Sequence, residues 1–140
     1  MGRILTADAL LRRGWDNNYF CPLCMRNLET PFHLLAECPW AKQIWEKLST
    51  QFRLPSLNPT SWSEATSVVD WLRLCSNNAT TQQRKKAHSL LMLTSWEIWR
   101  ERNRRIFDKE EMSIVSLVNR IRDEARLWNM AGAQIPFDPG

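Results

Sequence analysis

The spacing of three cysteines and one histidine constrains this chain more than any other feature. Two residues separate Cys21 from Cys24, eight separate Cys24 from His33, and four separate His33 from Cys38. Zn²⁺ prefers four ligands at the corners of a tetrahedron, and thiolate and imidazole suit it. A two-residue gap lets the first two cysteines share one tight turn, which Pro22 helps to fix. The pattern therefore predicts one zinc ion bound by Cys21, Cys24, His33 and Cys38.

Two other interpretations of these residues compete with a metal site. The cysteines could be buried free thiols beside a core histidine, and this alternative stays open. A redox-active C-x-x-C pair does not fit, because Cys21 does not follow a strand of a βαβ unit. If zinc binds, the protein fills all four positions around the ion, so the site is structural rather than catalytic.

The compartment also bears on the cysteines. The first residues lack the apolar stretch of a secretory signal. We therefore expect an intracellular protein, in the nucleus or cytoplasm and not secreted. In a reducing compartment, clustered cysteines indicate metal binding rather than disulfides. The apolar runs are far shorter than the roughly twenty residues that cross a membrane, so we expect no membrane contact.

Composition favours a helical fold. The chain has 140 residues, which is enough for one domain, and 44% of them are hydrophobic. Eight tryptophans can bury large apolar areas, whereas one tyrosine and four glycines are too few for an all-β fold. We predict a mainly α protein: a small helical domain organised around a CCHC zinc knuckle, followed by longer packed helices.

Local signals divide the chain into predicted elements. Thr30-Pro31 is a strong helix start, Ser61 with Glu64 has the form of a capping box, and Ser113 can cap the last helix. The predicted helices are 5–13, 32–37, 39–52, 61–75, 82–107 and 113–132. The predicted division is a zinc-binding domain at 1–52, a linker with a short helix at 53–81, a C-terminal helical region at 82–133, and a loose tail at 134–140.

Further motifs give residues 5–48 a resemblance to a known family. These motifs are Leu5-Thr6, Leu10-Leu11-Arg12-Arg13-Gly14, Cys21-Pro22-Leu23-Cys24, Glu29-Thr30, His33-Leu34-Leu35, Glu37-Cys38-Pro39 and Ile44-Trp45. In this order, they resemble the zinc-binding domain that follows the reverse transcriptase in plant LINE-type (non-LTR) retrotransposons. Residues 96–107 and 128–133 resemble segments that come after it in such polyproteins. The resemblance implies the same four zinc ligands and a role in holding RNA or DNA near a polymerase.

Basic residues are the candidates for nucleic-acid contacts. The net charge is +4, carried by fourteen arginines and five lysines against fifteen acidic residues, and arginine binds phosphate well. The candidates are Arg12, Arg13, Arg26, Arg84, Lys85, Lys86, Arg100, Arg102, Arg104 and Arg105. A solvated helix face with internal ion pairs, such as Glu101 with Arg105, is the competing interpretation of the last four. Trp45 and Trp71 fall on apolar stripes, whereas Trp15 and Trp62 are freer to stack on bases.

The leading hypothesis from the sequence is a zinc-dependent accessory domain that binds nucleic acid. Its expected partners are RNA or DNA and, as a second candidate, a reverse transcriptase domain, with no small-molecule substrate. The rival hypothesis is a structural or protein-interaction scaffold in which zinc only stabilises the fold. We expect no enzymatic activity, because no polymerase, endonuclease or RNase H motif is visible in the sequence.

Overall fold

The computed structural model describes residues 20–130, and helices dominate this range. The elements are η1 (His33–Glu37), α2 (Pro39–Gln51), η2 (Pro55–Leu57), η3 (Pro59–Trp62), α3 (Val68–Asn77), α4 (Arg84–Asn103), η4 (Arg104–Asp108) and α5 (Ile114–Met130). η1 and η4 are π-helical turns, while η2 and η3 are 3-10 turns. In the described range, β pairing is confined to one isolated bridge between Phe20 and Leu28. The predicted mainly α class is confirmed.

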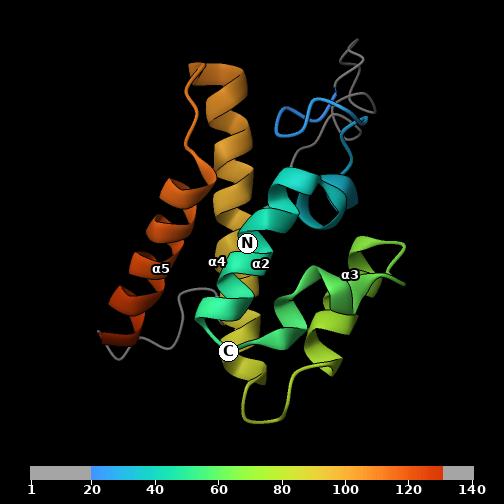
Figure 1. The fold of residues 1–140 in the computed structure, drawn as a ribbon, viewed down its shortest axis with the longest axis vertical. Coiled ribbons are helices and arrows are strands. Elements are labelled where there is room, and N and C mark those ends of the chain that lie inside the picture. Colours follow the sequence, from blue (N-terminus) through green and yellow to red (C-terminus); the bar gives the residue numbers. More distant parts are fainter. Residues whose placement is uncertain (1–19, 131–140) are drawn as a thin grey trace.

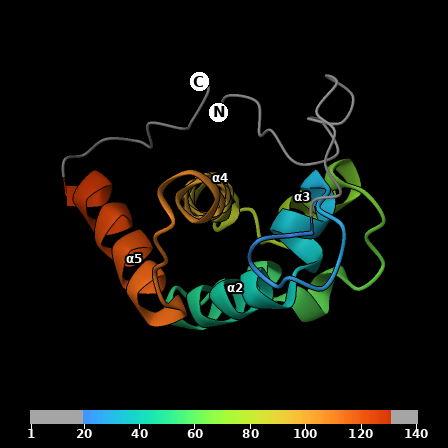
Figure 2. The same cartoon turned by 90° about the horizontal axis from the view of Figure 1, so that it is seen from above.

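Helix α4 is the central element of the arrangement. It runs along the molecule, and α5 returns antiparallel beside it (Figure 1). Seen along α4, helix α2 lies across one side of it, with α5 and α3 at opposite flanks (Figure 2). α4 also packs against η1. The C-terminal end of α4 therefore reaches the segment that carries the predicted zinc ligands.

Helix starts follow the local chemistry at two of the three predicted positions. The Thr30 hydroxyl accepts a hydrogen bond from the His33 amide at 3.0 Å, and the Ser113 hydroxyl accepts one from Ser116 at 3.1 Å. The predicted start at Ser61 is wrong. Its hydroxyl donates to the carbonyls of Ser56 and Asn58 inside a 3-10 turn, so it cannot act as a cap.

Helix α3 instead begins after Ser67, six residues beyond the predicted start at Ser61. The Ser67 hydroxyl accepts from the Asp70 amide at 3.1 Å, as an N-cap does. The residues around Ser61 belong to η3, which Asn58 caps through its side-chain oxygen and the Thr60 amide. Two serine caps of similar local quality thus compete, and tertiary packing selects the second.

Three tryptophans form the centre of the core. Trp45 of α2, Trp62 of η3 and Trp71 of α3 pack edge to face, with ring centroids 5.5–5.6 Å apart. Trp62 is buried, so the prediction that it is free to stack on bases is wrong; its indole N–H donates to the Ser56 carbonyl at 2.9 Å. Residues 53–81 thereby contribute to the same core cluster as α2 and α4. The division into domains stays a prediction.

Several predictions lie outside the described residues. They concern the helix at 5–13, Trp15, the segment 131–133 and the tail at 134–140. None of the helices within residues 20–130 is long and apolar enough to span a membrane.

Candidate metal centre

The first two candidate ligands lie on a tight loop. The bridge between Phe20 and Leu28 closes its base, and the Cys21 amide donates to the Asn27 carbonyl at 2.7 Å. At its tip, the Met25 amide donates to the Cys21 carbonyl at 2.7 Å, and Met25 adopts a left-handed φ of 59°. This reversal turns the chain back immediately after Cys24, so both thiols lie on the inner side of the loop. We call residues 20–28 the zinc loop.

The other two candidate ligands are brought together by the wide turn η1. The Cys38 amide donates to the His33 carbonyl at 2.7 Å, which closes the turn over five residues rather than the four of an α-helix. Residues five apart in sequence therefore lie one above the other. Cys38 then adopts extended angles before Pro39, which ends η1 and starts α2.

The four donor atoms converge. The Sγ atoms of Cys21 and Cys38 are 3.8 Å apart, and the Cys24 Sγ is 3.3 Å from the His33 Nε2. All four donor atoms lie within 4.8 Å of one another. Zn–S bonds of about 2.3 Å in a tetrahedron place two sulfurs about 3.8 Å apart, and a sulfur and a nitrogen about 3.6 Å apart. The donors therefore need to close by at most about 1 Å to surround a zinc ion.

The alternative of a disulfide does not fit the geometry. All four cysteines are free thiols, and a separation of 3.8 Å between sulfurs is far from a bond of about 2.05 Å. Cys75 is buried in α3, where burial raises the pKa of its thiol to about 12. It is not part of the cluster. Three thiols and an imidazole in one group, of which only Cys24 is partly exposed, are a donor set that fits tetrahedral Zn²⁺.

The protonation of the donors reflects their contact. A hydrogen bond to Cys38 raises the pKa of the Cys21 thiol to about 12, and the same bond lowers the pKa of Cys38. A hydrogen bond to Cys21 raises the pKa of His33 to about 9. In the metal-free state at neutral pH, Cys21 and His33 therefore carry protons that an incoming zinc ion has to displace.

The structure separates the ten predicted basic residues into three groups. Arg12 and Arg13 lie outside the described residues. The exposed side chains are Arg26, Arg84, Lys85 and Lys86. The arginines at the end of α4 and in η4 form ion pairs within the protein: Arg100 pairs with Glu97, and both Arg104 and Arg105 pair with Glu101.

Arg102 requires a correction. It was predicted as a nucleic-acid contact, but it is 1% exposed. Its Nε and Nη2 atoms donate to the two carboxylate oxygens of Glu29, both at 3.0 Å. Because such a pair is desolvated and already bidentate, its guanidinium is not available to a phosphate in this conformation. Arg102 is therefore no longer a candidate for contact with nucleic acid.

Three buried carboxylates were missed from the sequence as structural residues. Glu29, Glu97 and Glu101 are all buried and all paired with arginines. The spacing of Glu101 and Arg105 by four residues did signal their pair. Nothing local signals Glu29 with Arg102, since 73 positions separate them. Only the packing of α4 against the zinc loop reveals that contact.

Comparison with known proteins adds one finding. Residues 1–45 match the family model described as zinc-binding in reverse transcriptase. The match includes all four candidate ligands and covers 45 of the 140 residues. It confirms the resemblance to a reverse transcriptase zinc-binding domain, whereas an origin in plant LINE-type elements stays a prediction. No curated protein and no solved structure gives a significant match.

The ligand set makes a direct prediction. Replacing Cys38 with serine should abolish stoichiometric zinc binding, because the remaining three donors leave the tetrahedron open. Elemental mass spectrometry, which measures the zinc content of the purified variant, tests this prediction. Cys75→Ala is the matched control, since it removes a buried thiol outside the cluster and should keep the zinc of the unmodified chain. Equal zinc content in both variants would contradict the assignment.

Zinc affinity should also depend steeply on pH. With pKa values of about 12 for Cys21 and about 9 for His33, both groups are protonated at pH 7 and release protons when zinc binds. Displacing at least these two protons weakens the apparent affinity by about a hundredfold or more for each unit by which the pH falls. Chelator competition between pH 7.5 and pH 6 measures the slope, and an affinity independent of pH would refute this account of the donors.

Proposed function

We propose that this protein is a zinc-dependent, nucleic-acid-binding accessory domain derived from a retrotransposon reverse transcriptase polyprotein of the plant LINE type, and that it is non-catalytic by itself. The observation that carries the proposal is the match of residues 1–45 to a zinc-binding family of reverse transcriptase, with the four donors of that segment gathered within 4.8 Å. One zinc ion would hold the loop that presents the binding surface.

The zinc loop has the chemistry of a surface that binds single strands. Met25 at its tip is 69% exposed, and Phe20, Arg26 and Leu28 of the same loop are also exposed. Apolar and aromatic side chains stack on unpaired bases, and an arginine can pair with the phosphate between them. Packing alone gives no reason to leave three large apolar side chains in water around one small loop.

A second basic cluster lies at the other end of α4. Arg84, Lys85 and Lys86 are exposed in the first turn of α4, and the sequence of that turn contains no acidic residue. Positive charge is locally unfavourable at a helix N-terminus. The Lys86 ammonium lies over the Phe52 ring, 5.6 Å from its centroid. About 27 Å of helix separates this cluster from Arg102 and the zinc loop, so the two surfaces would contact different parts of a strand.

The non-catalytic part of the proposal rests on what the donors and carboxylates already do. The four zinc donors would complete the coordination of the ion and leave no position for a substrate. Glu29, Glu97 and Glu101 are held in ion pairs inside the protein. Carboxylates in that state are poorly placed to bind the metal ions of a polymerase or nuclease.

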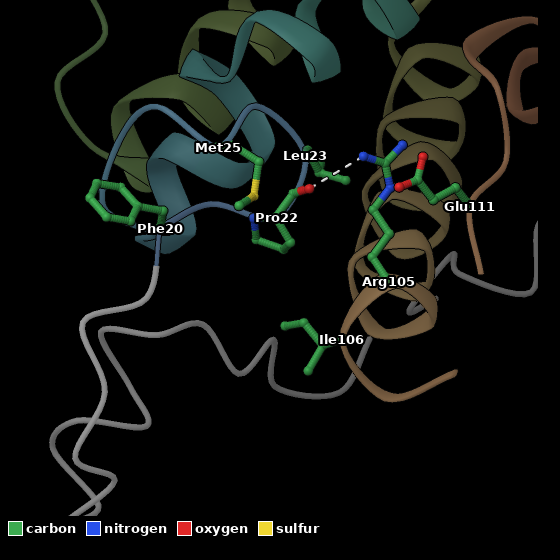
Figure 3. Close-up of a pocket in the computed structure, with 7 residues that line it drawn as sticks. All are labelled: Phe20, Pro22, Leu23, Met25, Arg105, Ile106 and Glu111. Atoms are coloured by element: carbon green, nitrogen blue, oxygen red, sulfur yellow. Dashed lines mark hydrogen bonds between the residues drawn. The ribbon is translucent and has the colours of Figure 1, made fainter. Parts of the chain in front are cut away.

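One observation favours the scaffold as a second candidate function. A groove of about 560 Å³ lies between the zinc loop and η4, lined by Phe20, Pro22, Leu23, Met25, Arg105, Ile106 and Glu111 (Figure 3). Phe107 is also exposed on η4. A mostly apolar groove is a common feature of protein-binding surfaces. In this alternative, zinc stabilises the fold and the same loop contacts a protein.

Charge reversal on the zinc loop tests the leading function. Arg26→Glu should weaken binding of labelled single-stranded RNA by about tenfold at low salt, because it replaces a phosphate contact with repulsion. Fluorescence anisotropy at two salt concentrations measures this, with single-stranded and duplex DNA in parallel. The binding should fall as salt rises, since phosphate contacts release counterions.

Two variants with the same change of charge are the controls. Arg73→Glu lies on α3, where Arg73 is exposed and pairs only loosely with Asp70 at 3.7 Å; it should have little effect. Arg84→Glu reports on the second cluster. Equal losses for Arg26→Glu and Arg73→Glu would mean that only net charge matters. A zinc-loaded chain that binds none of the nucleic acids at low salt would favour the scaffold.

A further inference from the structure

The zinc loop is in contact with residues far away in sequence, at the C-terminal end of α4 and in η4. Arg102 fixes Glu29, which follows the loop directly, through a buried bidentate ion pair. Three residues later, Arg105 donates from Nη1 to the carbonyl oxygen of Pro22 at 3.2 Å. Figure 3 shows this guanidinium reaching the Pro22 carbonyl across the groove. Pro22 lies between the two cysteines of the loop.

Arg105 also contacts the other half of the metal centre. Its guanidinium lies over the Trp40 ring, 4.7 Å from the ring centroid. Trp40 is two residues after Cys38, in the first turn of α2. One side chain therefore touches a neighbour of Cys21 and a near neighbour of Cys38, the two ligands whose Sγ atoms are 3.8 Å apart.

Glu101 keeps the Arg105 side chain in place. The Glu101 carboxylate is completely buried, and its Oε2 accepts from Arg105 Nε at 2.8 Å and from the Met112 amide at 3.0 Å. Its Oε1 accepts from Arg104 at 2.9 Å. With 12% of its side chain exposed, Arg105 is largely desolvated. A charged hydrogen bond there is stronger and more directional than one in water.

The backbone hydrogen bonds within the zinc loop do not fix its position relative to η1. The described backbone bonds of residues 21–25 connect the loop to itself, from Cys21 to Asn27 and from Met25 to Cys21. Such bonds shape the turn but do not set its distance from η1, which carries the other two donors. That distance depends on contacts between the loop and other elements, and Arg105 contacts both the loop at Pro22 and α2 at Trp40.

We infer that Arg105 is a positioning residue of the metal centre: it braces the turn of Cys21 and Cys24 against the start of α2, so that all four donors are in place before the metal arrives. The inference rests on the proposed zinc binding. It extends the centre to a residue of η4 that lies 67 positions beyond Cys38 and outside the 1–45 match.

The test uses the full chain with Arg105→Met and Arg105→Lys. Methionine keeps an apolar stem over Trp40 but donates nothing, and lysine keeps the charge but lacks the planar fork that serves Pro22 and Glu101 together. Both variants should bind zinc about ten- to a hundredfold more weakly in chelator competition, the usual range for lost outer contacts of a metal site. Titration with Co²⁺ should give altered absorption bands, because they report the geometry of the ligands.

Arg100→Met is the matched control. Arg100 lies five residues earlier, in α4, and pairs with Glu97, and no described contact joins it to the zinc loop. It should bind zinc and Co²⁺ as the unmodified chain does, even if its resistance to urea falls. A role of Arg105 in stability alone would lower the urea midpoint of its variants and leave metal affinity and the Co²⁺ spectrum unchanged, which overturns the inference.

The unmodified chain separates this inference from the proposed function. If the unmodified chain binds no zinc, both the proposed function and the positioning role of Arg105 are refuted. If the unmodified chain binds one zinc ion and Arg105→Met binds zinc with equal affinity, only the positioning role of Arg105 is refuted. Weak zinc binding by Arg105→Met together with normal zinc binding by Arg100→Met supports the positioning role of Arg105. If Arg105→Met does not fold, the zinc affinity of Arg105→Lys is compared with that of Arg100→Met instead.

Discussion

The buried ion pair of Glu29 with Arg102 is the contact on which the arrangement of this protein depends. Removing either partner would leave a charge without water or a counter-charge, and such a loss costs about 3–5 kcal/mol. The pair therefore fixes where α4 ends relative to the zinc loop. Near this pair, the Glu101 carboxylate accepts hydrogen bonds from the side chains of Arg104 and Arg105 and from the backbone amide of Met112. The segment matching a zinc-binding family and the distant helix α4 thus form one continuous structure.

This network changes how the arginines of α4 are understood. A run rich in arginine in the same chain as a zinc-binding motif suggests phosphate contacts, yet most of this run forms ion pairs within the protein. Among the predicted nucleic-acid contacts within residues 20–130, the exposed cations are Arg26 of the zinc loop, beside exposed apolar side chains, and the basic residues at the start of α4. The proposed binding surface is accordingly smaller than charge alone suggests. It is also more specific in its chemistry, since it combines stacking with phosphate contact.

What could be predicted from the sequence was local. The four donors fall within eighteen residues, and Thr30, Pro39 and Ser113 act within one helical turn, so short-range rules describe them. The burial of Trp62 and the start of α3 at Ser67 could not be predicted in this way, because packing around Trp45 and Trp71 decides both. Arg102 is the clearest failure of local reasoning: its partner is 73 positions away, and nothing in the surrounding run of arginines marks it as the buried one.

Amide hydrogen exchange of the full chain, with zinc and after chelation, tests most directly whether the metal centre and the end of α4 are one unit. The account predicts that removing zinc raises exchange in residues 21–38 and also in residues 100–108, while α3 keeps its protection. Faster exchange confined to residues 21–38, or no change anywhere on chelation, would contradict it.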